Sequence, residues 1–73
     1  ARALAIEAAW RAAAGPSIAR RAVVRRLARG VLEIDVAEAA WRRVLVQILP
    51  EIEARLRRDH PALAIEHLRM MDD

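Results

Sequence analysis

Apolar residues recur at three- and four-residue steps between residues 35 and 60, which is the longest such run in the chain. The run consists of Trp41, Val44, Leu45, Ile48, Leu49, Ile52 and Leu56. This spacing places their side chains on one face of a helix. Asp35 and Glu38 have the spacing of a helix-capping pair, and the proline at position 61 ends the segment. We therefore predict a long helix from Val36 to about Arg58.

Pro50 lies inside this predicted helix. A proline in a helix interior removes the hydrogen bond to the carbonyl four residues earlier, here that of Val46, and bends or breaks the helix. Leu49 is a poor N-cap residue for a second helix, and the apolar stripe continues across the proline. A single kinked helix is therefore favoured over two separate helices.

Three shorter helices are expected around the long one. Residues 2–14 are mostly alanine and apolar, and Gly15 with Pro16 ends them. Residues 17–29 start at a capping Ser17 and end before Gly30, and a last helix starts at Pro61. Residues 31–34 alternate as a strand does, but the stretch is too short to build a sheet and is expected to be a connector. We expect an all-α fold: a single domain over residues 1–73 that forms a small four-helix bundle with one long, proline-kinked central helix.

The last predicted helix carries apolar side chains on two sides, and one side would exceed what its own core can bury. We expect this surplus surface to bind a second copy of the chain, which predicts a homo-oligomer; a monomer that displays the helix to another protein is the alternative. The residues of this predicted assembly surface are Leu63, Ile65, Leu68, Met70 and Met71.

The net charge of +3 conceals an asymmetry between the two parts of the chain. Residues 1–30 hold seven arginines and one acid, whereas residues 31–73 hold six arginines and nine acids. The predicted helix 17–29 contains no acid, so its arginines form a face suited to nucleic-acid phosphates or to an acidic partner. They are Arg20, Arg21, Arg25, Arg26 and Arg29. A face paired with acids such as Glu33, Glu51 and Glu53 is the simpler interpretation, since only Gln47 could read bases.

Residue types that carry catalysis are scarce. The sequence has no Cys, Lys or Tyr, its one Ser is used as a cap, and its two glycines are isolated. We therefore expect no enzyme and no cofactor. His60 and His67 are too few for a protein-only zinc site, and adjacent Glu66 and His67 would project about 100° apart on a helix, so no metal is expected.

Composition bears on the origin of the chain. Ala and Arg dominate, while Lys, Thr, Asn, Phe, Tyr and Cys are absent. A computed design filled with helix formers and a GC-rich genome both explain this bias, and we favour the design. The recurrence of residues 7–11 at 38–42 and of residues 3–7 at 62–66 is better explained by chance than by duplication.

The expected function is thus a non-enzymatic helical self-assembly or protein-interaction module, with a designed origin favoured. A small basic nucleic-acid-binding protein that uses the Arg face is the alternative. No apolar run has the length of a membrane span and no signal peptide is apparent, so no membrane partner is expected, and the protein is expected to be cytoplasmic if natural.

Overall fold

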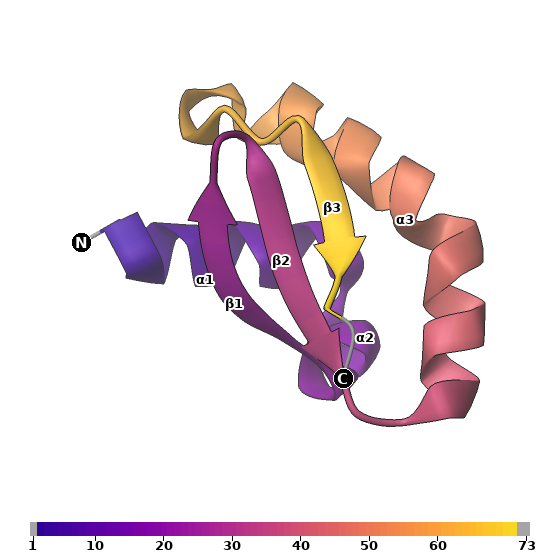
Figure 1. Cartoon of the computed structure of the whole chain (residues 1–73). Helices are drawn as coiled ribbons and strands as arrows, with labels where there is room; N and C mark the ends of the chain where they lie inside the picture. Colours follow the sequence, from indigo (N-terminus) through magenta and orange to yellow (C-terminus); the bar gives the residue numbers. More distant parts are fainter. Residues whose placement is uncertain (1, 72–73) are drawn as a thin grey trace.

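The computed structural model describes residues 2–71 and contains both helices and strands, with more of the chain in helices (Figure 1). The elements in chain order are α1 (Arg2–Ala14), α2 (Pro16–Arg21), β1 (Ala22–Ala28), β2 (Val31–Val36), α3 (Ala39–Asp59), a 3₁₀ turn (Pro61–Leu63) and β3 (His67–Met70). The prediction of an all-α four-helix bundle is therefore wrong, and the fold is mixed α/β.

The three strands form one sheet in the order β1-β2-β3. β1 and β2 are antiparallel, and β2 and β3 are parallel. Arg29 and Gly30 make the two-residue turn between β1 and β2, and both have positive φ, 53° and 79°. Turns of this kind match the twist of a hairpin and favour Asn, Asp or Gly. The helices pack on one face of the sheet, and the other face is open (Figure 1).

The predicted helix 17–29 is wrong beyond Arg21, where β1 begins. Val23 and Val24 are β-branched and fit a pleated strand better than a helix. A helix would also align three arginines at four-residue spacing, which repel one another. In the hairpin, by contrast, residues 31–36 supply hydrogen-bond partners and acids. The predicted connector is thus the central strand of the sheet.

The predicted helix that starts at Pro61 is also wrong over the described residues 61–71. A single 3₁₀ turn follows α3, Ala64 adopts a left-handed conformation with φ 54°, and β3 then runs parallel to β2. Leu68 is buried while its neighbours His67 and Arg69 are exposed, which is the alternation of a strand. The sequence echo of residues 3–7 at 62–66 is not a structural repeat, because residues 3–7 lie in α1 whereas residues 62–66 lie in the turn and the loop after it.

The prediction that Pro50 lies within one kinked helix is confirmed. α3 continues from Ala39 to Asp59 with Pro50 inside it, and it bends midway in Figure 1. The helix starts three residues later than predicted, because Asp35 and Val36 belong to β2. Glu38 occupies the N-cap position without a side-chain hydrogen bond, so the predicted capping pair does not form.

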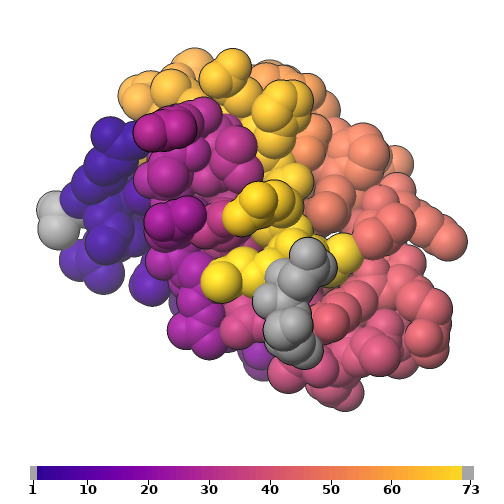
Figure 2. Space-filling model, in the orientation of Figure 1, coloured from indigo at the N-terminus to yellow at the C-terminus, as the bar shows by residue number. Residues whose placement is uncertain are grey.

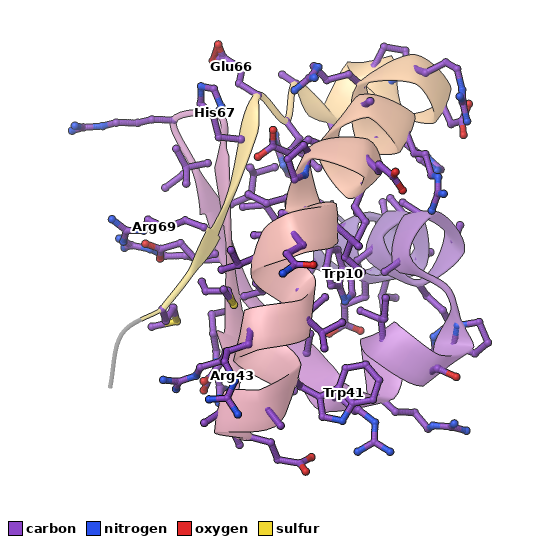
Figure 3. The ribbon with its side chains drawn as sticks, turned by 90° about the vertical axis from the view of Figure 1, so that its right-hand side faces the viewer. Trp10, Trp41, Arg43, Glu66, His67 and Arg69 are labelled. Carbon is purple, nitrogen blue, oxygen red and sulfur yellow. The ribbon has the colours of Figure 1, made fainter. Side chains whose placement is uncertain are left out.

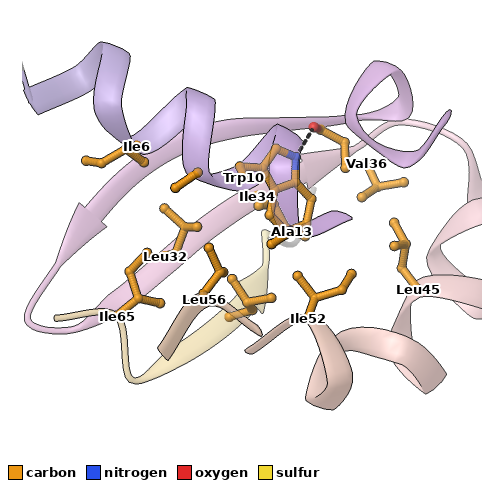
Figure 4. Packing of buried hydrophobic residues seen from close by; sticks show 13 residues of the cluster. Ile6, Trp10, Ala13, Leu32, Ile34, Val36, Leu45, Ile52, Leu56 and Ile65 are labelled. Carbon is orange, nitrogen blue, oxygen red and sulfur yellow. Dashed lines mark hydrogen bonds between the residues drawn. The ribbon is translucent and has the colours of Figure 1, made fainter. Parts of the chain in front are cut away.

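The core lies between the sheet and the helices (Figure 4). Its buried side chains are Ile6, Ala9, Trp10 and Ala13 of α1, Ala22 of β1, Leu32, Ile34 and Val36 of β2, Leu45, Ile52 and Leu56 of α3, and Ile65 and Leu68. The indole nitrogen of Trp10 donates a hydrogen bond of 3.1 Å to the carbonyl of Ala22. The predicted stripe of α3 faces this core with one exception: Val44 is 48% exposed.

The residues of the predicted assembly surface do not share a helix face. Leu63 ends the 3₁₀ turn, and Leu68 and Met70 lie in β3. Ile65 and Leu68 belong to the chain's own core, and Leu63 and Met70 pack against it. Met71 is partly buried. The surplus apolar helix that suggested assembly is therefore absent from residues 61–71.

Candidate interaction surface

The open face of the sheet carries alternating charges, and Figure 2 looks onto it. We define this face by the outward side chains Val23, Arg25, Arg26 and Ala28 of β1, Val31, Glu33 and Asp35 of β2, and His67 and Arg69 of β3. Figure 3 shows Arg69 and His67 pointing away from Trp10 and from α3. The helix-covered face is apolar, so the charged side chains of the sheet lie on the open side.

Glu33 is the centre of the open face and links all three strands. Its carboxylate accepts from Arg26 of β1 at 2.5 Å and also from Arg69 of β3. Although it points away from the core, its side chain is only 6% exposed, because the two arginines cover it. The hydrogen bond from Arg26 lowers the pKa of Glu33; burial opposes this shift and Arg69 adds to it.

Two further ion pairs extend this network toward α2. Arg25 of β1 donates to Asp35 of β2 at 2.9 Å. Arg21 of α2 lies 3.2 Å from Glu38 and packs over the ring of Trp41, 4.6 Å from its centroid. The stacked guanidinium covers one side of Trp41 and joins the end of α2 to the start of α3.

The five arginines of the predicted helical face are divided among three elements. Arg20 and Arg21 lie in α2, Arg25 and Arg26 lie in β1, and Arg29 lies in the hairpin turn. Three of them pair with acids, whereas Arg20 and Arg29 form no ion pair with any residue between 2 and 71.

Of the acids predicted to pair with these arginines, only Glu33 does so, through Arg26. Glu51 and Glu53 pair instead with Arg55 and Arg57 of their own helix. Sequence reasoning missed Asp35, Glu38 and Arg69 as members of the surface. The alternation over residues 31–36 was the signal that could have placed Asp35 beside Glu33.

Two hollows lie at opposite ends of β1. The one at the hairpin end has a volume of about 600 Å³ and is lined by Arg26, Ala28, Arg29, Val31, Glu33 and Arg69. The one at the α2 end has a volume of about 450 Å³ and is lined by Arg20, Arg21, Val23, Arg25, Asp35, Ala37 and Glu38. Each hollow thus combines ion pairs, an apolar floor and one arginine without an acidic partner.

Both edges of the sheet are modified in ways that disfavour pairing with another strand. The register of β1 shifts between Val24 and Arg26, which places a bulge at Arg25. At the other edge, the amide of Leu68 in β3 donates to the carboxylate of Glu53 at 2.9 Å. Bulges, charges and covering side chains are the usual means of protecting sheet edges.

The two histidines do not come together with carboxylates at a metal site. His60 lies between α3 and the 3₁₀ turn and makes no capping hydrogen bond, and His67 lies on β3. Within the described part of the chain, no three His, Cys, Asp or Glu side chains are grouped so that they could hold a metal ion. None of the helices in that part is long and apolar enough to cross a membrane.

Comparison with known proteins corrects the expected origin and function. The family model described as "Dna[CI] antecedent, DciA" matches residues 1–70, and a comparison with curated proteins finds no match. A match to a natural family overturns the interpretation as a designed self-assembly module. The alternative of a nucleic-acid-binding helix is not supported either, because that helix does not form and most of its arginines are paired. The chain belongs to the DciA family.

Proposed function

We propose that this domain is a non-catalytic interaction module that contacts the bacterial replicative helicase DnaB in the cytoplasm. The family match over residues 1–70 carries the proposal, because DciA-family proteins interact with the DnaB helicase and with DNA. We propose the open face of the sheet as the contact surface.

The arrangement of charges on the open face supports a protein contact. Arginine is enriched at protein interfaces, where its planar guanidinium binds carboxylates with defined geometry. Here the ion pairs to Glu33, Asp35 and Glu38 already hold four arginine side chains in place. Less side-chain freedom is therefore lost when a partner binds, which favours affinity.

The electrostatics of Glu33 argue against acid–base catalysis at this face. A general base works best with a pKa near the operating pH, which for a carboxylate requires a raised pKa. The pKa of Glu33 is instead lowered, and its oxygens are occupied by Arg26 and Arg69. This carboxylate is suited to ordering the surface rather than to accepting a proton from a substrate.

Binding of the 73-residue chain to the purified DnaB helicase, measured by biolayer interferometry, tests the proposal. Two exposed valines provide a matched pair of variants: Val23 on the open face is 50% exposed, and Val46 on α3 is 58% exposed. We expect Val23→Asp to weaken binding and Val46→Asp to leave it unchanged. Absence of binding by the unmodified chain refutes the function, and an effect of Val46→Asp alone moves the contact to α3.

A further inference from the structure

We infer that the open face binds an acidic α-helix of the partner protein, with a carboxylate near each end of that helix held by Arg29 and by Arg20. The inference rests on the proposed function in taking the partner to be a protein, and it specifies which chemistry of that partner is recognised. It follows from the two hollows, from the arginines that remain unpaired in them, and from the distance between them.

In the hollow at the hairpin end, Arg26 and Arg69 are occupied by Glu33, and Arg29 is left with no acid among residues 2–71. Arg29 also has a φ of 53°, which is unfavourable for a residue with a side chain. Asn or Gly would fit this turn position better. The pairing of Ala28 with Val31 holds this turn conformation, and the Arg29 guanidinium, which has no acid within residues 2–71, is available to a partner's carboxylate.

In the hollow at the α2 end, Arg21 and Arg25 are paired with Glu38 and Asp35. Arg20 is exposed at the rim and forms no ion pair within the described chain. Half-exposed Val23 forms part of the lining. The hollow therefore offers one available guanidinium beside an apolar surface, as its counterpart does.

The separation of the hollows suits a helix. β1 has seven residues, and at about 3.3 Å per residue the two ends lie roughly 20 Å apart. A helix rises about 1.5 Å per residue, so about 13 residues span this distance. Covering the second face of a sheet with a helix is a common way to complete a layered packing. The apolar side chains along the path are Val23, Ala28 and Val31.

The charge balance favours carboxylates over nucleic-acid phosphates. Six arginines on the face and its rim oppose three acids, so a positive surplus remains. However, Glu33 and Asp35 lie between the two available arginines and are already paired with arginines, so a continuous phosphate backbone would find no available guanidinium in the middle of the face. A helix can place its acids at the two ends and apolar side chains over the middle, which matches this distribution.

The test compares R20Q/R29Q with the control R11Q/R43Q, which removes two other exposed arginines that lie on α1 and α3. Binding to the DnaB helicase is measured at about 50 mM and about 300 mM salt. We expect R20Q/R29Q to bind roughly tenfold more weakly at low salt, as the loss of two exposed ion pairs predicts. The control should change affinity less than about twofold, and the difference should shrink at high salt.

Equal losses in both variants, or no loss in R20Q/R29Q, overturn the inference while leaving the helicase contact in place. A second arm does not depend on the helicase: the probe is a capped 16-residue Ala/Leu helical peptide with glutamates at positions 1 and 15, which lie about 21 Å apart and on the same side of the helix. The same peptide with lysines is its control. The unmodified chain should bind the glutamate peptide, and R20Q/R29Q should not; failure here also overturns the inference. If R20Q/R29Q loses only oligonucleotide binding, the face serves nucleic acid and the inference is wrong.

Discussion

Substitution of Trp10 by phenylalanine tests how α1 is held to the sheet. Trp10 is 3% exposed, and its indole nitrogen donates to the carbonyl of Ala22, which is fully buried. Phenylalanine keeps an aromatic ring in the core but lacks the N–H donor. The variant therefore leaves a buried carbonyl without this hydrogen bond and a small void where the larger ring was.

The expected cost is large for so small a domain. A buried acceptor without its partner costs about 1–3 kcal/mol. The smaller ring adds about 1 kcal/mol through lost packing. A total of about 3 kcal/mol is a substantial part of the roughly 4–11 kcal/mol expected for 73 residues. It corresponds to a fall in Tm of roughly 12–24 °C.

Trp41→Phe is the matched control, because the chain has two tryptophans. Trp41 is only partly buried, and its polar contact is the stacked guanidinium of Arg21. Such exposed cation–π contacts contribute about 0.5–1 kcal/mol, and phenylalanine retains part of it. Urea unfolding followed by circular dichroism gives both values. If Trp10→Phe destabilises no more than Trp41→Phe, the indole–carbonyl bond does not anchor α1 and the reasoning is refuted.

Three further predictions concern stability. Gly30→Ala should destabilise by about 1–2 kcal/mol in urea unfolding, because φ is 79° and the added Cβ would lie 2.5 Å from a Glu66 oxygen; a neutral result would mean that the turn relaxes. Leu45→Ala should cost about 2–5 kcal/mol, while Val44→Ala, on the exposed side, should cost under about 0.5 kcal/mol. Because folding lowers the pKa of Glu33, its contribution is complete above the unfolded value of about 4.3 and is lost as pH falls through the folded value. Thermal unfolding at about pH 6 and about pH 3 should therefore show a smaller acid-induced loss for Glu33→Gln than for the unmodified chain; equal losses would contradict this.

The helical parts of the fold were predictable because their signals are local. Residues 2–14 and the stripe around Leu45, Ile52 and Leu56 have the helical period, and Gly15 marks an end. A helix closes its hydrogen bonds within itself, so a short window of sequence is enough to recognise it. The continuation of the stripe across Pro50 gave the correct choice between a kinked and a divided helix.

The strands were not predictable in the same way, because their partners are distant. β3 pairs with β2 although all of α3 lies between them in the sequence, and Leu68 is opposite Leu32. No local pattern over residues 67–70 reports that pairing, and an alanine- and arginine-rich composition makes helix the default interpretation. One local signal was available: Arg29-Gly30 stands between two runs of β-branched and aliphatic residues, which is typical of a hairpin turn.

The candidate surface, like the fold, could be predicted from the sequence only in part. The arginine cluster was visible in the sequence, and Glu33 was named among its partners. The position of Arg69 beside Glu33 could not be predicted without the sheet, since only the parallel pairing of β2 with β3 brings these two residues side by side.

The protected edges explain why a face, rather than an added strand, is the natural route to a partner. A strand docking on β1 would meet the bulge at Arg25, which breaks the regular spacing of backbone groups. A strand docking on β3 would have to displace the Glu53 carboxylate from the amide of Leu68. Displacement would leave a charge without its hydrogen bond, which costs more than the single bond gained. With one face packed on helices and both edges obstructed, the charged open face is the remaining surface of the sheet for a partner to bind.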